Sequence, residues 1–337
     1  MKVAIFCKSF STSRPAKNSR YADWGPANGD AQLFSLPLES DDMPQLSKRI
    51  LILLLTAAGA NSFYPSRAAE PKVTIDQAIS PTNEPIVLFD GKSLGDTYTW
   101  LKETQREDPK QVFRVDDGLL HVTGDGFGSL ITNKAYRDYH LILEFRWGEK
   151  TWHDRENAAR DSGLLIHSNG ADGGYEGTWK PSIEVQIIEG GVGDFILVGG
   201  NDDAGKPIPL SLTAHVTHDR DDEVVWSESG TKTTFGDPKP PRINWYGRDP
   251  DWADVKGFRG AKDVESPGQE WTRIDVFADG DRITTFVNGV KVNEATNVFP
   301  TAGQIQLQTE LAELFFRRWE LYPLGSGPIP APAVQVK

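Results

Sequence analysis

The chain has 337 residues, with 36 Lys and Arg against 48 Asp and Glu, and a formal net charge of −12. Binding to nucleic acid depends on basic stripes that face phosphates, so this acidic composition excludes nucleic acid as an expected partner. The single cysteine excludes a disulfide scaffold and a Cys-based zinc site. Thirty-two glycines, 22 prolines and ten tryptophans indicate a folded, turn-rich protein.

A short apolar segment follows Met43. Two basic residues precede a mostly apolar run, Ile50 to Ala60, and small residues follow it. This order is typical of a secretory signal peptide, and the run is shorter than the roughly 20 residues that span a bilayer. We therefore expect residues 1–42 to be a prefix from a mis-assigned start codon and residues 43–69 to be a signal peptide. The mature protein is then periplasmic or secreted without a stable membrane anchor; an internal membrane anchor is the alternative.

From Pro85 onward, apolar residues recur with a period of two in short runs separated by Gly, Asn, Asp and Pro. Residues 112–122 resemble a hairpin around an Asp-Gly turn, and residues 271–292 a meander with Asp-Gly and Asn-Gly turns. No 12-residue stretch in this region carries a helical apolar stripe. Many short strands with close turns predict an all-β sandwich or barrel, which we assign to one domain, residues 84–323. The other predicted strands are 139–147, 163–167, 182–188, 304–308 and 314–321.

Two segments depart from this pattern. Residues 201–268 are charged and contain Pro and Trp, and we expect them to form a long loop insertion. A loop of this length within a compact domain is usually functional. Residues 324–337 are rich in Pro and Gly and are expected to form an extended tail.

Polar residues alternate with apolar ones on four of the predicted strands, so each strand presents polar side chains on one side. A solvated sheet face explains such alternation by default. Here, however, the residue types are Glu, Gln, His and Arg, which hydrogen-bond sugar hydroxyls or transfer protons. We therefore expect them to line one shared sheet face. The residues are Glu144, Arg146, His167, Glu184, Gln186 and Gln308.

Three aromatic residues near these strands are candidates for the walls of a sugar site. Trp147 ends the strand of Glu144, and Tyr175 and Trp179 precede the strand of Glu184. Aromatic rings stack on the apolar C–H faces of pyranose rings. Packing in the core or in a loop is the alternative for each of them.

Other motifs carry less information. The segment from Glu184 to Glu189 approximates the Glu-x-Asp-x-x-Glu strand of retaining endoglucanases, but Gln186 replaces the middle carboxylate, and the two Glu would face opposite sides of a regular strand. No zinc or calcium spacing is recognisable, so the metal requirement stays open. The absence of phosphate-binding glycine motifs predicts no nucleotide cofactor. Residues 91–95 match a nucleophile elbow, but no helix follows, and we interpret them as a turn.

The segment LFDGKSL, residues 88–94, resembles the opening of the 3-keto-disaccharide hydrolase family. Further family elements follow in the same order, and the resemblance covers roughly residues 84–323. Two positions depart from the family pattern: His167 stands where an Arg is common, and Glu189 replaces an aspartate. The further matching elements are residues 113–119, 130–146, 162–167, 184–187, 270–289 and 303–317.

The resemblance implies a concanavalin A-like jelly-roll sandwich of two antiparallel sheets that cleaves glycosides already oxidised to a ketone at sugar C3. The ketone acidifies the C2 proton, so a base can remove it, and the resulting enolate expels the C1 substituent. Water addition then completes a net hydrolysis; without it, the enzyme is a lyase. A divalent metal is one way to stabilise the enolate.

As a hypothesis, His167 or Glu184 is the base and Glu144 is its acid partner. A saccharide is the expected ligand in this reading and also in the alternative one, a non-catalytic lectin-like module. A third reading, an adhesion or scaffold protein, predicts a large apolar patch instead. The predicted catalytic residues are Glu144, His167 and Glu184, and the predicted substrate-binding residues are Arg146, Gln186, Gln308, Trp147, Tyr175 and Trp179.

Overall fold

The computed structural model describes residues 75–236 and 242–328. The chain divides into residues 1–67 and residues 68–337, and all described residues belong to the second unit. The predicted prefix and signal peptide, residues 1–69, lie outside the described residues. Within the described ranges, no helix has the length and apolar character needed to cross a membrane.

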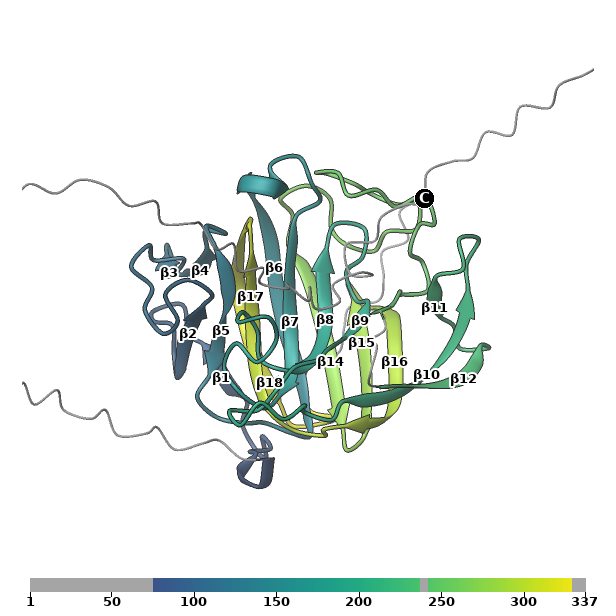
Figure 1. Cartoon of the computed structure of the whole chain (residues 1–337), viewed down its shortest axis with the longest axis horizontal. Helices are drawn as coiled ribbons and strands as arrows, with labels where there is room; N and C mark the ends of the chain where they lie inside the picture. The colour runs from purple at the N-terminus through teal and green to yellow at the C-terminus, as the bar shows by residue number, and fades with distance from the viewer. Residues whose placement is uncertain (1–74, 237–241, 329–337) are drawn as a thin grey trace, which may run out of the picture. The chain divides into compact units, whose positions relative to one another are not determined.

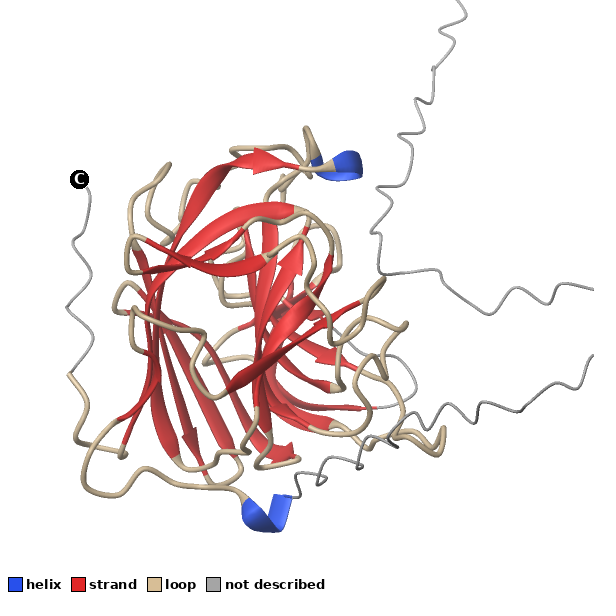
Figure 2. Cartoon of the chain, turned by 90° about the vertical axis from the view of Figure 1, so that its left-hand side faces the viewer, coloured by secondary structure: helices blue, strands red, loops and turns tan. Residues whose placement is uncertain are grey.

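In these ranges, strands stack in two antiparallel sheets, which Figure 2 shows as two layers. The eleven-stranded sheet has the order β11 (Val224–Trp226), β10 (Ser211–His218), β16 (Val290–Phe299), β15 (Arg282–Val287), β14 (Thr272–Asp279), β6 (Tyr139–Thr151), β18 (Ala312–Tyr322), β4 (Leu119–Val122) and β3 (Phe113–Asp116), with β1 (Ile86–Phe89) on β18 and β12 (Thr231–Gly236) on β10. The seven-stranded sheet has the order β13 (Arg242–Ile243), β9 (Phe195–Val198), β8 (Ser182–Ile188), β7 (Asp161–Ser168), β17 (Gln304–Glu310), β5 (Phe127–Thr132) and β2 (Thr97–Leu101) (Figure 1). Two 3₁₀ turns, η1 (Ile75–Gln77) and η2 (His153–Arg155), complete the described elements. The predicted all-β jelly-roll sandwich of two antiparallel sheets is confirmed.

The predicted turns lie where the sequence places them. β3 and β4 form the expected hairpin, and β14, β15 and β16 form the expected meander. Asn288 and Gly289 both have positive φ, 47° and 79°, which the tight turn between β15 and β16 requires. Local turn chemistry therefore sets the register of these strands.

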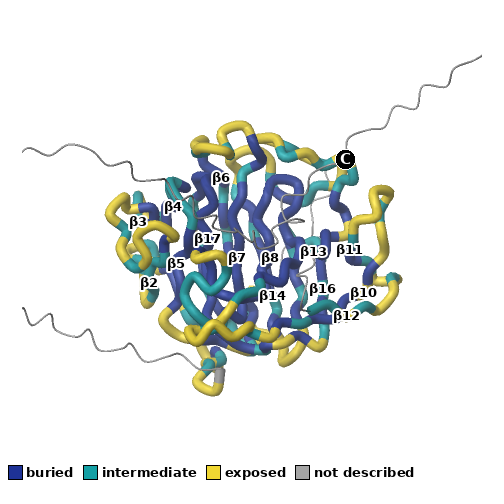
Figure 3. Tube along the Cα trace, in the orientation of Figure 1, coloured by how far each residue is buried: buried dark blue, intermediate teal, exposed yellow. Residues whose placement is uncertain are grey.

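The apolar core lies between the two sheets, because one side of each central strand carries large aliphatic and aromatic residues. Figure 3 shows the central strands as buried and the connecting loops as mostly exposed. Full burial of one such side chain contributes about 1.5–3 kcal/mol. The side chains on the other face of the same strands point outward, as β alternation requires. Core residues of β6 and β8 include Leu141, Leu143, Phe145, Ile183, Val185 and Ile187, all fully buried.

The expected long loop at residues 201–268 is wrong in part, because this region contains four strands, β10 to β13. β10 pairs with β11, β12 and β16, so it extends the eleven-stranded sheet. Its buried Leu212, Ala214 and Val216 alternate with polar residues. The small alanine and the surrounding charges obscure this alternation in the sequence.

We expect Leu143→Ala to destabilise the protein by about 2–5 kcal/mol, because it leaves a cavity at a fully buried position between the sheets. Val87→Ala is the matched control, because the side chain of Val87 is 51% exposed; its effect should stay within about 0.5 kcal/mol. Urea denaturation measures both. Equal effects would contradict the placement of the core.

Candidate functional site

The outer face of the seven-stranded sheet carries a continuous row of residues. Residues paired directly across antiparallel strands point to the same face. Gln186 on β8 pairs with Gly163 on β7, and Ser129 on β5 pairs with both Gln308 on β17 and Trp100 on β2. Since β7 and β17 are neighbours, Gly163 lies beside Gln308. Side chains far apart in the sequence thus meet on one surface.

Glu184 on β8 reaches into this row at Gly163. A Cβ atom at position 163 would overlap Oε1 of Glu184 and would lie 2.6 Å from Oε1 of Gln308. A glycine within a strand often marks a place where another group approaches closely. Here the missing side chain makes the room in which a carboxyl group and an amide oxygen converge.

Five buried oxygen atoms on this face have no hydrogen-bond partner among the residues that the structure describes. They are Oγ of Ser129, Oδ1 of Asp161, Oγ of Ser182, Oε1 of Glu184 and Oε1 of Gln308. They come from β5, β7, β8 and β17, which are adjacent strands. Buried polar groups are nearly always hydrogen-bonded, and each unsatisfied group costs about 1–3 kcal/mol. A ligand rich in hydroxyl groups would supply the missing partners.

A group of buried charges lies on the same face beside Gly163. Nη2 of Arg155 in η2 is 2.8 Å from Oδ2 of Asp161 and 3.1 Å from Oε1 of Glu310. Its Nη1 is 3.8 Å from Oδ1 of Asp254. One guanidinium group therefore lies near three carboxyl groups. If all three are ionised, their combined negative charge exceeds the single positive charge of Arg155.

This excess and the burial of the groups raise the carboxyl pKa values. Desolvation is the main cause of the raised pKa of Asp161, and for Glu310 the negative charge of Asp161 adds to desolvation. Desolvation, followed by the charges of Glu310 and Asp161, raises the pKa of Glu184 well above its ordinary value. The carboxyl group of Glu184 therefore holds its proton more strongly than an exposed carboxyl group does, which suits a proton donor.

The face is more cationic next to Gln186. Asp194, which is fully buried, accepts hydrogen bonds from Nη2 of Arg242 at 2.6 Å and from Nη1 of Arg248 at 2.5 Å. The guanidinium of Arg248 also stacks over Trp252 at 4.5 Å. Desolvation lowers the pKa of Arg248 to about 10, so it stays charged at neutral pH. Two positive charges thus share one carboxylate at this end.

Tyr175 and Trp179 lie over the same sheet, as the sequence predicts. Their rings stack with centroids 6.1 Å apart. Trp179 is only 8% exposed, and its Nε1 donates to the carbonyl oxygen of Gly128 at 3.1 Å. Trp179 thus packs mainly against its own sheet, while Tyr175 is partly exposed. Trp179 forms a small apolar cluster with Leu165, Ile196 and Val198, against which Phe127 and Tyr175 pack.

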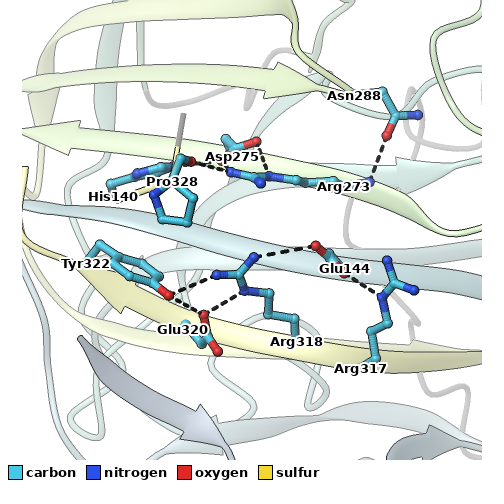
Figure 4. Close-up of polar contacts among 10 residues, drawn as sticks. All are labelled: His140, Glu144, Arg273, Asp275, Asn288, Arg317, Arg318, Glu320, Tyr322 and Pro328. Carbon is cyan, nitrogen blue, oxygen red and sulfur yellow. Dashed lines mark hydrogen bonds and ion pairs between the residues drawn. The ribbon is translucent and has the colours of Figure 1, made fainter. Parts of the chain in front are cut away.

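Glu144 and Arg146 lie on the other sheet, so the expectation that they share a face with Glu184 is wrong. The carboxylate of Glu144 on β6 is 2.5 Å from Nε of Arg317 and 3.6 Å from Nη1 of Arg318 (Figure 4). Arg146 lies near the rings of Trp271 and Phe315 on that sheet. Alternation shows which side of a strand faces outward, but not to which sheet the strand belongs.

His167 is buried in the core, which corrects the expectation that it faces the polar side. The pairing of β7 with β17 shifts between Gln304 and Gln306, and His167 has a φ of 52°, so the regular alternation of β7 ends before it. Its Nδ1 is 2.9 Å from the carbonyl oxygen of Pro300, and its ring contacts Tyr139 of the core edge-on. Desolvation lowers the pKa of His167 to about 4, so it is neutral and shielded.

Trp147 also belongs to the core rather than to a sugar-binding wall. It is 3% exposed and packs edge-on against Phe145, with ring centroids 5.5 Å apart. Its Nε1 donates a hydrogen bond to the carboxyl group of Glu265. Trp147 therefore packs in the core, which is the alternative that the sequence left open for each of the three aromatic residues.

Several charged residues of the site are not among the predicted site residues. Glu310 continues the polar alternation of Gln304 to Gln308, and Asp161 precedes the Ser-Gly element of the family pattern, but the sequence assigns no role to either. Arg155 and Arg242 come from segments without strand periodicity. Their positions depend on tertiary contacts, so no local signal identifies them.

The charged groups do not form a metal-binding set. In residues 75–236 and 242–328, no three His, Cys, Asp or Glu side chains converge as ligands. Arg155 already contacts both Asp161 and Glu310. The donor set therefore does not fit a divalent metal.

Comparison with protein families places the chain among carbohydrate-active jelly-roll domains. More particularly, the family described as the 3-keto-alpha-glucoside-1,2-lyase-like domain matches residues 84–321. The chain belongs to this family, which confirms the resemblance seen in the sequence motifs. A comparison with curated proteins finds no significant match.

Solved structures with similar architecture have low sequence identity to this chain. Two from Parabacteroides distasonis ATCC 8503, provisionally described as glycosyl hydrolases, are 16% and 17% identical, cover 71% and 72% of this chain and 94% and 100% of their own, and have TM-scores of 0.39. A β-glucanase from Bacillus licheniformis is 11% identical over 72% of this chain and 95% of its own, with a TM-score of 0.33.

We expect Gly163→Ala to displace the Glu184 carboxyl group, because the new Cβ would occupy its position. The overpacking should cost about 1–3 kcal/mol of stability. Gly199→Ala is the matched control, because no atom lies within 4 Å of a Cβ built there. Crystal structures and urea denaturation of both variants test this, and an unmoved Glu184 would contradict the described site.

The raised pKa of Glu184 predicts a pH-dependent stability. Because the folded state holds this proton more tightly than the unfolded state, its contribution is fully present below the unfolded pKa of about 4.3 and is lost as pH rises through the folded pKa. Glu184→Gln should therefore lose less stability than the wild type between pH 5 and pH 9. Urea denaturation across this range measures the difference, and parallel curves would contradict the assignment.

Proposed function

We propose that this protein cleaves the glycosidic bond of saccharides that carry a ketone at C3, by elimination across C1 and C2. The observation that carries the proposal is the set of buried, unpartnered oxygen atoms around Gly163, which includes a carboxyl oxygen of Glu184, a residue whose pKa burial raises. Membership of the 3-keto-alpha-glucoside-1,2-lyase-like family supports the same chemistry. The proposal includes export of the mature protein, which the apolar segment after Met43 supports.

The reaction needs a base, an acid and a means of stabilising negative charge. A carboxylate on the face takes the C2 proton, and the C–H electron pair forms the enolate with the C3 carbonyl. The enolate then expels the C1 oxygen, which receives a proton from Glu184. The products are an alcohol and a sugar with a double bond between C1 and C2. Arg242 and Arg248 supply a positive field for the developing charge.

The remaining polar groups suit the binding of sugar hydroxyls. Oγ of Ser129 and Oε1 of Gln308 are buried and unpartnered, and Gln186 lies in the same row. Tyr175 offers a partly exposed ring beside them. If water adds to the unsaturated product before release, the net reaction is hydrolysis; if not, the enzyme is a lyase.

Glu184→Gln should lower turnover of a 3-keto-disaccharide by about a hundredfold or more, because the amide cannot protonate the leaving oxygen. Glu144→Gln is the matched control: its carboxylate lies on the other sheet with Arg317, and turnover should stay near the wild-type value. Release of the free sugar and absorbance of the conjugated enone measure the reaction.

Plain and C3-oxidised disaccharides should be compared in the same assay. Turnover of the oxidised substrate alone supports the proposal. Binding of either saccharide without turnover would instead identify a lectin-like module, and full activity of the Glu184 variant would remove Glu184 from the mechanism.

A further inference from the structure

Asp161 and Glu310 form a carboxyl pair on the substrate face, on the adjacent strands β7 and β17. They are 1% and 5% exposed, and a single nitrogen atom, Nη2 of Arg155, lies within 3.1 Å of both. Two carboxylates that share one cation at this degree of burial cannot both be ionised without a large penalty. The geometry therefore favours one proton held between the two groups.

The two carboxyl groups differ in how their oxygen atoms are bound. Oδ2 of Asp161 accepts from Arg155, while its Oδ1 is buried and has no partner in the described chain. Oε1 of Glu310 is held by Arg155. Asp161 also lies two residues from Gly163 on the same strand, and residues at this spacing point to the same side. Asp161 therefore shares the sheet face of Gly163, and Oδ1 is its oxygen atom without a partner there.

The charged groups that act on this pair come from several elements. Arg155 and Arg242 favour ionisation of the pair. Asp254 adds negative charge near it, and Glu184 does so when it is ionised. Tyr175, from the loop over the sheet, is close enough to respond to the charge of Glu310. Among the described residues, Arg155 is the cation in direct contact with Glu310, and Arg242 acts on both carboxyl groups electrostatically. The state of the pair therefore depends on its burial, on these two arginines and on the interaction between its two members.

We propose that Asp161 is the catalytic base that removes the C2 proton. Glu310 and Arg155 are positioning residues that influence whether Asp161 carries a proton. This inference rests on the proposed function. Oδ1 of Asp161 takes the proton, and the electron pair passes from the C2–H bond to the enolate. The C1–O bond then breaks, and the leaving oxygen takes its proton from Glu184. Asp161 ends the step protonated and Glu184 ionised, so protons and charge balance.

The first test is the Asp161→Asn variant. Its kcat on a 3-keto-disaccharide should fall by about a hundredfold or more at every pH, because an amide cannot accept the proton. Substrate binding, measured by calorimetry, should remain. Asp275→Asn is the matched control: Asp275 is a fully buried carboxylate bound by Arg273 and His140 on the other sheet, and its replacement should leave kcat within about threefold (Figure 4).

The second test is the pH profile of Glu310→Gln. The amide oxygen can still accept from Arg155, but the proton that Glu310 shares with the ionised Asp161 is gone. Since a shared proton favours the ionised form of Asp161, the acidic limb of kcat/KM should move to higher pH, by about one unit. A purely structural role for Glu310 would lower activity without moving this limb. This variant also keeps the inference testable if the Asp161 variant does not fold.

The outcomes separate the two proposals. If Glu184→Gln loses turnover while Asp161→Asn keeps it, or if the acidic limb of Glu310→Gln is unmoved, the role of the pair is overturned and the proposed function stands. If the wild type does not turn over any 3-keto-disaccharide, the proposed function fails and this inference fails with it.

Discussion

Antiparallel pairing of β8, β7, β17 and β5 is the constraint on which the site depends. Pairing forces directly opposed side chains onto one face, so Gln186, Gly163, Gln308 and Ser129 form a row although they are spread over 180 residues of chain. Gly163 matters within this row because any larger residue would occupy the space that Glu184 and Gln308 share. A shift of one residue in the register would turn this entire set toward the core.

Burial then changes the acid–base properties of these groups. A carboxyl group in water is ionised at neutral pH, whereas desolvation and neighbouring negative charges raise the pKa of Glu184 well above its ordinary value. The same burial makes one arginine, Arg155, insufficient for the carboxyl groups around it. The protein therefore holds acids with raised pKa values on one sheet face, at some cost in stability at high pH, which is common at functional sites.

Similar residues have different polar partners on the two sheets. On the eleven-stranded sheet, Glu144 is held by two arginines, and its neighbours form a ladder of ion pairs (Figure 4). On the seven-stranded sheet, Glu184 has a carboxyl oxygen without a partner. Paired charges on an outer sheet face are a structural arrangement, and unpartnered buried ones indicate a binding site. The sequence shows the same alternation around both glutamates and cannot separate them.

The sequence by itself determined most of the central strands, the turns of the hairpin and the meander, the outward side of most central strands and, through its motifs, the family. These features depend on local alternation and on turn residues such as Asn288 and Gly289. Local alternation is also the reason why the sequence could assign Glu184, Gln186 and Gln308 to an outward strand face. Only the tertiary structure decided that Glu144 and Arg146 belong to the opposite sheet, that a break in β7 turns His167 inward, and that Arg155 meets Asp161 and Glu310. The physical reason is that sheet membership, strand irregularities and charge clusters depend on contacts between segments far apart in the chain, which no local pattern encodes.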